Sequence, residues 1–252
     1  MLTLSFGGSR SGGELSAGFV NADDTDVSYT RGRYFRNNRD GTRTLAAEFG
    51  VNEPATQSPA LQVAALQNRT AVEYQAGFSG REYIRLRADA NELFTRVEEA
   101  RIARGLSVRG EVGTRGSFGS NIWSSSVALA SARYDRESEL PTELQLAPDS
   151  SFDNILADRF TSLGWSTSLA RGGVNSDYPQ VSSPRYFINS TLGYSWPENA
   201  FGVQVEGGIG VRVLGGDELS FLFSHDTLAS ELVGDDANST GVSLNYRYHF
   251  GR

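Results

Sequence analysis

Apolar and polar residues alternate strictly along the last stretch of the chain. From Val242 to Phe250 the sequence reads Val, Ser, Leu, Asn, Tyr, Arg, Tyr, His and Phe. Successive side chains of a β-strand point to opposite faces, so this stretch predicts a strand with one apolar, aromatic face and one polar face. Aromatic rings are well placed at a boundary between lipid and water. The pattern is therefore typical of a membrane-spanning strand, and the alternative is a half-exposed strand of a soluble sheet.

The same alternation recurs along the chain and predicts about 13–14 strands. Many of them are about 9–12 residues long, the length that a tilted membrane-spanning strand needs. The segment from Ala60 to Leu66 fits either an extra short strand or a helical turn. The predicted strands cover approximately 2–6, 14–20, 27–35, 45–51, 72–78, 83–91, 106–115, 122–134, 163–169, 188–196, 201–213, 219–223 and 242–250.

A meander whose strands all have one apolar and one polar face cannot pack a conventional core. If the sheet closes with its apolar face outward, lipid covers that face and every edge group is paired. The fold class that we expect is therefore all-β, an antiparallel up-and-down transmembrane β-barrel that forms a single domain over residues 1–252.

Loop lengths orient this predicted barrel. In outer-membrane barrels the C-terminus is periplasmic, periplasmic turns are short and outer loops are long. Counted back from Phe250, the outer loops are 22–26, 51–68, 95–104, 136–158, 197–199 and 229–239. The periplasmic turns are then 9–13, 37–42, 79–80 (the two-residue signal Ser79-Gly80), 116–120, 172–184 and 215–217. All fit except 172–184, which is too long, and 197–199, which is too short.

Composition narrows the function classes. There is no Cys, which excludes disulfides and thiolate chemistry, and no run of apolar residues is long enough for a transmembrane helix. A net charge of −7 disfavours nucleic-acid binding. No signal peptide follows Met1, and the count of loops places the start of the first strand on the outer side of the membrane. We therefore expect this to be the C-terminal fragment of a longer chain, with one or three strands upstream, unless one strand of this chain has been missed.

The strand faces predict the site residues. The polar face, which would line the pore, carries Glu14, Glu48, Glu73, Arg85, Arg87, Asp89, Arg109, Glu111, Arg115, Glu206, Arg212 and Arg247. Charges of both signs there fit either a polar lumen or salt bridges that simply fill it. A membrane girdle is predicted at Trp165, Trp196, Tyr246, Tyr248 and Phe250. An acidic mouth, which would attract cations, is predicted at Asp23, Asp24, Asp26, Glu137, Glu139, Glu143, Asp149, Asp153, Asp235 and Asp236.

Catalytic and metal sites are poorly supported. Ser224, His225 and Asp226 are the residue types of a catalytic triad, but neighbours on one strand face opposite ways and cannot form the hydrogen-bond relay. The chain has only two His and no adjacent carboxylate cluster, so no metal is expected. The glycines at 207–210 precede no helix and are not a phosphate-binding loop. We expect no enzymatic activity and no cofactor.

Several short stretches carry a resemblance to a known family. They are Ala60-Leu-Gln-Val-Ala-Ala-Leu-Gln before Arg69-Thr-Ala-Val-Glu-Tyr; Arg81-Glu-Tyr-Ile-Arg-Leu; Ala103-Arg-Gly-Leu-Ser-Val-Arg-Gly-Glu-Val-Gly; Val211-Arg-Val-Leu-Gly-Gly-Asp-Glu-Leu-Ser; and Tyr246-Arg-Tyr-His-Phe. In their order they resemble the C-terminal barrel of Pel-type exopolysaccharide export porins, which also carry a periplasmic tetratricopeptide region.

The resemblance implies a location and partners. It implies a bacterial outer-membrane porin, of about 16 strands in the parent protein, that exports a cationic, partly deacetylated amino-sugar polymer for biofilm matrix. The implied partners are the polysaccharide, outer-membrane lipid, an upstream tetratricopeptide region and periplasmic or lipoprotein export components. The alternative function is an autotransporter translocator barrel, which would carry a helix through its pore before the first strand. An outer-membrane enzyme is a third alternative, which the poorly supported catalytic residues disfavour.

Overall fold

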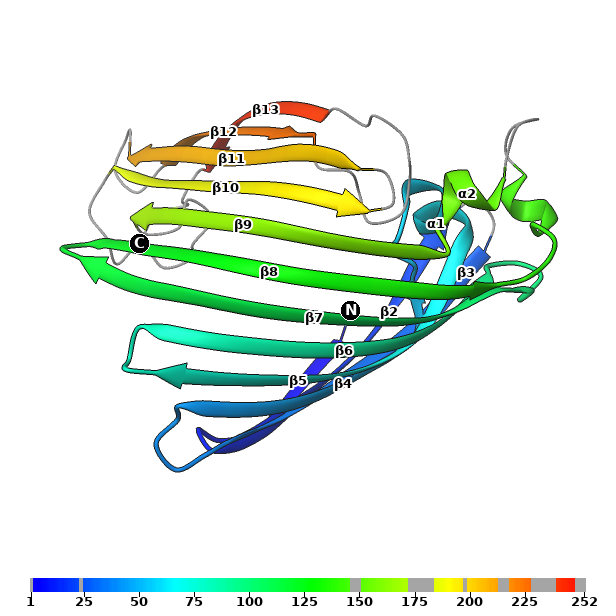
Figure 1. Ribbon diagram of the computed structural model, residues 1–252, viewed down its shortest axis with the longest axis horizontal. Coiled ribbons are helices and arrows are strands. Elements are labelled where there is room, and N and C mark those ends of the chain that lie inside the picture. The colour runs from blue at the N-terminus through cyan, green and yellow to red at the C-terminus, as the bar shows by residue number, and fades with distance from the viewer. Residues whose placement is uncertain are drawn as a thin grey trace.

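A single antiparallel sheet dominates the computed structural model, which describes residues 2–22, 25–145, 151–171, 184–196, 199–212, 218–227 and 239–247. Each strand pairs with its neighbours in sequence, so the order in the sheet is the order in the chain (Figure 1). The strands are β1 (Leu2–Gly7), β2 (Ser11–Ala22), β3 (Thr25–Asn37), β4 (Arg43–Pro54), β5 (Ala65–Phe78), β6 (Glu82–Thr95), β7 (Arg101–Phe118), β8 (Asn121–Arg136), β9 (Arg159–Arg171), β10 (Arg185–Trp196), β11 (Ala200–Arg212), β12 (Glu218–Asp226) and β13 (Ser239–Arg247).

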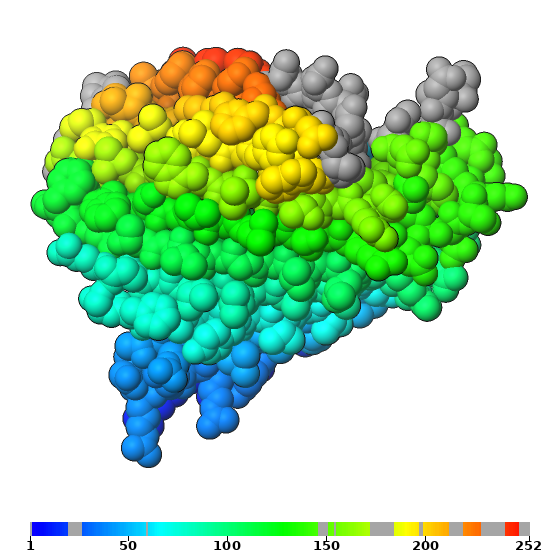
Figure 2. All heavy atoms as spheres, viewed as in Figure 1, coloured from blue at the N-terminus to red at the C-terminus, as the bar shows by residue number. Residues whose placement is uncertain are grey.

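The predicted all-β meander is confirmed. The described residues form 13 strands, which correspond one to one with those read from the alternation. β1 and β13 form the two edges and are not paired with each other in the described residues, so the sheet is curved but not closed. The space-filling view shows the strands following one another as continuous bands in chain order (Figure 2).

The two ends of the sheet differ as the loop lengths predict. Short turns join the strands at one end, except between β9 and β10, where 172–184 is long, and the helices α1 (Pro59–Ala64) and α2 (Phe152–Ile155) lie at the other end (Figure 1). The turn between β5 and β6 has three residues, Ser79 to Arg81, rather than the two expected. Ser79 (φ 42°) and Gly80 (φ 75°) adopt the left-handed conformation that a tight hairpin requires.

The strands run further toward the helical end than the alternation indicates. The predicted loops 22–26, 51–68 and 95–104 shorten to 23–24, 55–64 and 96–100. The segment 60–66, which the sequence left open, is helix up to Ala64 and strand from Ala65. Ser58 caps α1, because its hydroxyl accepts a hydrogen bond from the backbone N–H of Leu61 at 3.3 Å.

A small hydrophobic core, which we call the rim cluster, explains why the predicted strands are shorter than those in the structure. On β5 to β8 its members occupy the same face as the polar residues nearer the sheet's middle, and α1, the short 3-10 helix η1 (Thr142–Leu144) and α2 pack over them. With apolar residues on both faces, the two-residue alternation disappears there. The rim cluster consists of Ala55, Leu61, Ala65, Leu93, Ile102, Ala103, Ala132, Tyr134, Leu144, Ile155 and Leu156.

Large apolar side chains cover the opposite face of the sheet and are exposed. Leu86, Val108, Leu163 and Leu244 are all more than 40% exposed. Leu192, Val205 and Val211 lie on the same face but are half-buried. Among the described residues, none of the helices has the length and apolarity to cross a membrane. An exposed apolar face of this extent needs lipid to cover it.

Candidate pore lining

The polar face is the concave inner face of the sheet. Along β4, β5 and β6 the residues predicted to line the pore, such as Glu48, Glu73 and Arg87, share one face with the rim cluster. Their side chains are only partly exposed, because they contact one another across the strands. The described inner face therefore has the position that a pore lining requires.

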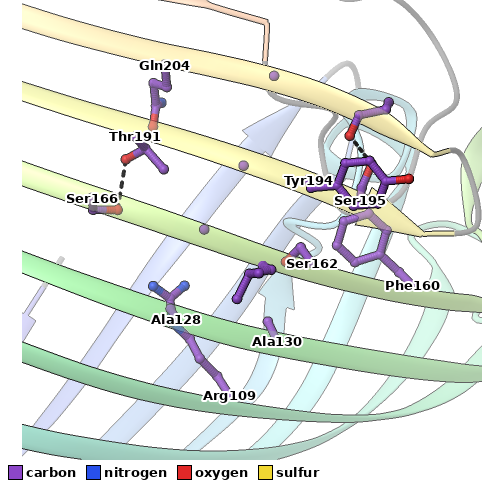
Figure 3. A pocket seen from close by; sticks show the side chains of 15 residues that line it. Arg109, Ala128, Ala130, Phe160, Ser162, Ser166, Thr191, Tyr194, Ser195 and Gln204 are labelled. Carbon is purple, nitrogen blue, oxygen red and sulfur yellow. Dashed lines mark hydrogen bonds between the residues drawn. The ribbon is translucent and has the colours of Figure 1, made fainter.

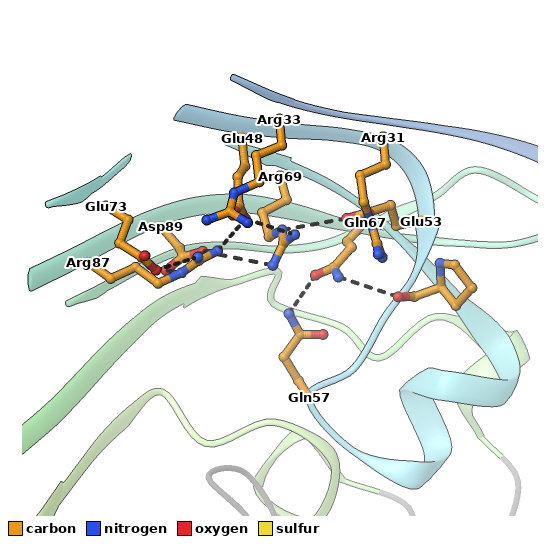
Figure 4. A network of polar contacts seen from close by, with 11 residues as sticks. Arg31, Arg33, Glu48, Glu53, Gln57, Gln67, Arg69, Glu73, Arg87 and Asp89 are labelled. Atoms are coloured by element: carbon orange, nitrogen blue, oxygen red, sulfur yellow. Dashed lines mark hydrogen bonds and ion pairs between the residues drawn. The ribbon is translucent and has the colours of Figure 1, made fainter. Parts of the chain in front are cut away.

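Charged side chains on β3 to β7 form one connected network, which we call the charged wall. Figure 4 shows the part of it on β3 to β6. Arg87 is its hub. Its guanidinium lies 2.9 Å from a carboxylate oxygen of Glu48 on β4, 2.8 Å from Asp89 on its own strand and 3.5 Å from Glu73 on β5. The members of the charged wall are Arg31, Arg33, Glu48, Glu53, Arg69, Glu73, Arg85, Arg87, Asp89, Arg109 and Glu111.

Four members of the charged wall were missed from the sequence. Arg31 and Arg33 stand two apart on β3, a spacing that puts both on one face and that could have revealed them. Glu53 and Arg69 lie where β4 and β5 extend beyond the expected strand ends. Glu53 follows a register shift after Gly50, and its buried carboxylate pairs with Arg31 and, at 3.5 Å, with Arg69.

Exposure within the charged wall is uneven. In each of its ion pairs the arginine is more exposed than the carboxylate: Arg31 is 57% and Glu53 2% exposed, and Arg109 is 51% and Glu111 8% exposed. The long arginine side chains reach past the shorter acidic ones, which stay close to the sheet. The charged wall thus exposes more of its arginine side chains than of its carboxylate side chains, although it contains nearly equal numbers of both charges.

The inner face changes character beyond β7. On β8 to β11 most inner-face side chains are small or carry a hydroxyl or amide group, with charged exceptions such as Arg185 and Glu206. We call the uncharged part of this region the neutral lane (Figure 3). Ser124 and Ser168 are hydrogen-bonded at 2.6 Å, and Ser166 and Thr191 at 3.0 Å. The neutral lane consists of Ala128, Ala130, Ser162, Gly164, Ser166, Thr191, Gly193, Ser195, Ala200, Gly202 and Gln204.

A hollow of about 250 Å³ lies on the neutral lane. Gly164, Gly193 and Gly202 are direct neighbours across β9, β10 and β11 and form its floor. Phe160 and Arg109 also line it, and Arg109 is the one charged side chain in that lining among the described residues. A surface of this kind offers many hydrogen-bonding groups and one fixed charge, at Arg109, which also belongs to the charged wall.

The remaining predicted lining residues lie outside both regions or cannot be placed. Glu14 on β2 accepts a hydrogen bond from Ser16, and Glu206 on β11 accepts one from Asn189 at 3.4 Å. Arg115 lies 6.0 Å from the ring centre of Tyr83, as a cation–π pair. The side chains of Arg212 and Arg247 lie outside the described residues, although both positions belong to strands.

The predicted acidic mouth is only partly described. Glu137 pairs with Arg101, and Asp153 with Arg136 at 2.8 Å. The carboxylate of Glu143 accepts hydrogen bonds from the backbone N–H groups of residues 97 and 98, and Glu139 is exposed. Asp23, Asp24, Asp149, Asp235, Asp236 and the side chain of Asp26 fall outside the described residues.

The predicted girdle residues lie on the outer face where they are described. Trp165, Trp196 and Tyr246 are exposed there, and Trp196 packs edge to face with Tyr194 at 4.6 Å between ring centres. Tyr248 and Phe250 lie outside the described residues. Their role at the membrane boundary stays a prediction.

Catalytic or metal chemistry finds little support in the described part of the chain. Ser224 and Asp226 pair with inner-face residues of β11, whereas His225 lies on the other face and contacts Thr240 at 2.8 Å. The three residues therefore cannot form a relay with one another. No group of three or more His, Asp or Glu side chains within the described ranges could hold a metal ion.

Comparison with known proteins places the chain in a family. The model of the family described as PelB, C-terminal beta barrel domain, matches residues 1–249. The chain belongs to the PelB C-terminal β-barrel family. The PelB-type barrel is thus located in the bacterial outer membrane, and its family is a transport-barrel family rather than a class of enzymes.

A solved structure shares the fold of this PelB-type barrel. It is described as a bacterial polysaccharide outer membrane secretin, with a TM-score of 0.61 and 10% sequence identity. The match covers 94% of this chain and 73% of that one. No curated protein sequence matches the chain. At this identity the likeness concerns the fold alone.

Proposed function

We propose that this barrel is a porin that exports an exopolysaccharide across the outer membrane for biofilm matrix. The observation that carries the proposal is the two-faced sheet, which is apolar outside and polar along the described inner face except beneath the rim helices. A polar inner wall suits a hydrated polymer, and an apolar exterior suits lipid. Membership of the PelB barrel family supports it, as does the polysaccharide secretin of similar fold.

The polymer that we propose is cationic, a partly deacetylated amino-sugar chain. The support is the surplus of acidic residues over the chain, 30 against 23 basic ones, and their concentration in the loops at the helical end. Clefts and mouths lined by one sign of charge raise the local concentration of the opposite ion. An upstream tetratricopeptide region and periplasmic or lipoprotein export components are the partners proposed with it.

Conductance across a planar lipid bilayer tests the function. The reconstituted protein should form an open pore whose current is interrupted when amino-sugar oligomers are added. Partly deacetylated oligomers should interrupt it more often than fully acetylated ones, because only the former carry ammonium groups. A pore whose current no polysaccharide changes would contradict the export function.

A further inference from the structure

We propose that the neutral lane is the path along which the exported polysaccharide slides, held by hydroxyl and amide groups, and that the polymer meets the charged wall only at Arg109, which also lines the hollow. The inference rests on the export function proposed above and adds where on the inner face the polymer binds. It assigns the hollow on β8 to β11 as a saccharide-binding subsite.

The charged wall is already engaged with itself. Arg87 binds three carboxylates, Arg69 lies within 4.0 Å of Glu48, Glu53 and Asp89, and Arg85 within 4.0 Å of Glu73 and Glu111. A saccharide hydroxyl would have to displace charge-assisted hydrogen bonds, which are about twice as strong as neutral ones. Binding on this side would therefore cost more than it returns.

The charged wall also repels a cationic polymer. In its ion pairs the arginine side chains are more exposed than the carboxylates that they contact. An ammonium group passing at this surface would meet positive charge first. The acidic loops and the charged wall would then act in sequence, since the loops attract the polymer and the wall directs it to the opposite side of the lumen.

The neutral lane has the chemistry that a sliding saccharide needs. Its serine and threonine hydroxyls and the Gln204 amide donate and accept hydrogen bonds, as sugar hydroxyls do. A neutral hydrogen bond contributes only about 0.5–1.5 kcal/mol net, so each contact breaks easily as the polymer advances. Conduction requires many weak sites rather than one strong site.

The geometry favours the same side. The hollow gives a polymer room close to the sheet, because the glycine row has no side chains there. The rim cluster, by contrast, is built from residues between Ala55 and Leu156 and covers the inner face at the helical ends of β5 to β8. Among the described residues the rim cluster has no member on β9 to β11, the strands that carry most of the neutral lane.

Cysteine protection tests the lane directly, because the native chain contains no Cys. Ser162→Cys and Ser166→Cys place a thiol on the neutral lane, and Gln75→Cys places one on the inner face of β5 beside the charged wall. Each variant of the intact protein is reconstituted in lipid vesicles and labelled with a methanethiosulfonate reagent, with or without partly deacetylated amino-sugar oligomers. The measured quantity is the labelling rate.

Oligomer at about ten times its Kd leaves roughly a tenth of the sites free, so labelling at Ser162→Cys and Ser166→Cys should slow about tenfold. Labelling at Gln75→Cys should change little. Equal or stronger protection at Gln75→Cys, in a pore that the oligomer blocks, would overturn the lane and leave the export function standing. A pore that no oligomer blocks, with no protection at any position, would overturn both.

Gly164 offers a second, independent test. A Cβ added there would meet only the carbonyl oxygen of Leu192 at 3.7 Å and a methyl group of Thr191 at 3.8 Å, which are ordinary contacts. Gly164→Trp should therefore abolish most polymer flux while small ions still pass. Gly110→Trp is the matched control, since Gly110 lies on the outer face and its Cβ would meet only Leu86 at 3.6 Å. Equal flux in the two variants would contradict the lane.

Discussion

Arg87 on β6 reaches across the whole of β5 to Glu48 on β4, and the two side chains meet at 2.9 Å. Neighbouring strands lie about 4.8 Å apart, so such a bridge forms only on a concave face with long side chains. The pair therefore ties three strands together through their side chains, in addition to the backbone ladder.

Removing this arginine should destabilise the sheet. Arg87→Met leaves Glu48, Glu73 and Asp89 without their shared cation at a site that is only 20% exposed. We expect a loss of about 1–3 kcal/mol in the free energy of unfolding, below the value for a fully buried pair because the site is partly wet. Urea unfolding in lipid vesicles measures it.

The double variant Arg87→Met/Glu48→Gln is the internal control for this pair. It should recover part of the loss, because one of the three carboxylates that lose Arg87 is neutralised, while Glu73 and Asp89 keep their charge. Arg104→Met removes a much more exposed ion pair, with Glu92, and should cost under about 1 kcal/mol. Losses of equal size at Arg87 and Arg104 would mean that the network does not hold the strands together.

A substitution in the rim cluster should destabilise the helical end without unfolding the sheet. Leu61→Ala empties a fully buried position on α1 and should loosen the helical end by about 2–5 kcal/mol of local stability. Val63→Ala, on the same helix but 65% exposed, should have almost no effect. Limited proteolysis of residues 137–158 should accelerate in Leu61→Ala alone, while heat-resistant migration of the barrel on gels stays unchanged.

A charged residue on the outer face, in the middle of the membrane, should lower the stability of the barrel. Val205 lies midway along β11 on that face, and Val205→Arg should cost about 2–4 kcal/mol in a bilayer. Gln204→Arg, one residue away on the inner face, should cost much less because its guanidinium meets water and Asp226. Equal unfolding free energies for both variants would mean that the two faces are assigned the wrong way round.

The sheet was predictable because each strand can be recognised from the alternation of apolar and polar residues within its own sequence. Strand order followed at once, since every strand pairs with its neighbour in the chain. Strand ends were not predictable where Leu93, Ala103 and Tyr134 make the inner face apolar beneath the rim helices. The Arg87–Glu48 bridge was also beyond reach, because it depends on curvature and on residues two strands apart.

The contacts of the described acidic residues determine which replacements should be used to test the acidic mouth. Glu137 and Asp153 are ion-paired and Glu143 binds backbone N–H groups, so the replacements should keep the shape of each side chain. Glu137→Gln, Glu139→Gln, Glu143→Gln, Asp149→Asn and Asp153→Asn are combined in one variant. Exposed charges contribute little to stability, so the barrel should still assemble.

Neutralising the mouth should weaken capture of cationic oligomers, chiefly at low salt, since the Debye length is only about 8 Å at physiological ionic strength. Single-channel recording measures the frequency of block when oligomers are added on the side of the helical end. The frequency of block by neutral oligomers should be the same in the native and the neutralised pore. Asp40→Asn with Glu82→Gln, at the short-turn end, is the control and should leave capture at the helical end as it was. If the neutralised pore captured cationic oligomers as often as the native one at low salt, the acidic loops would have no part in selecting the polymer.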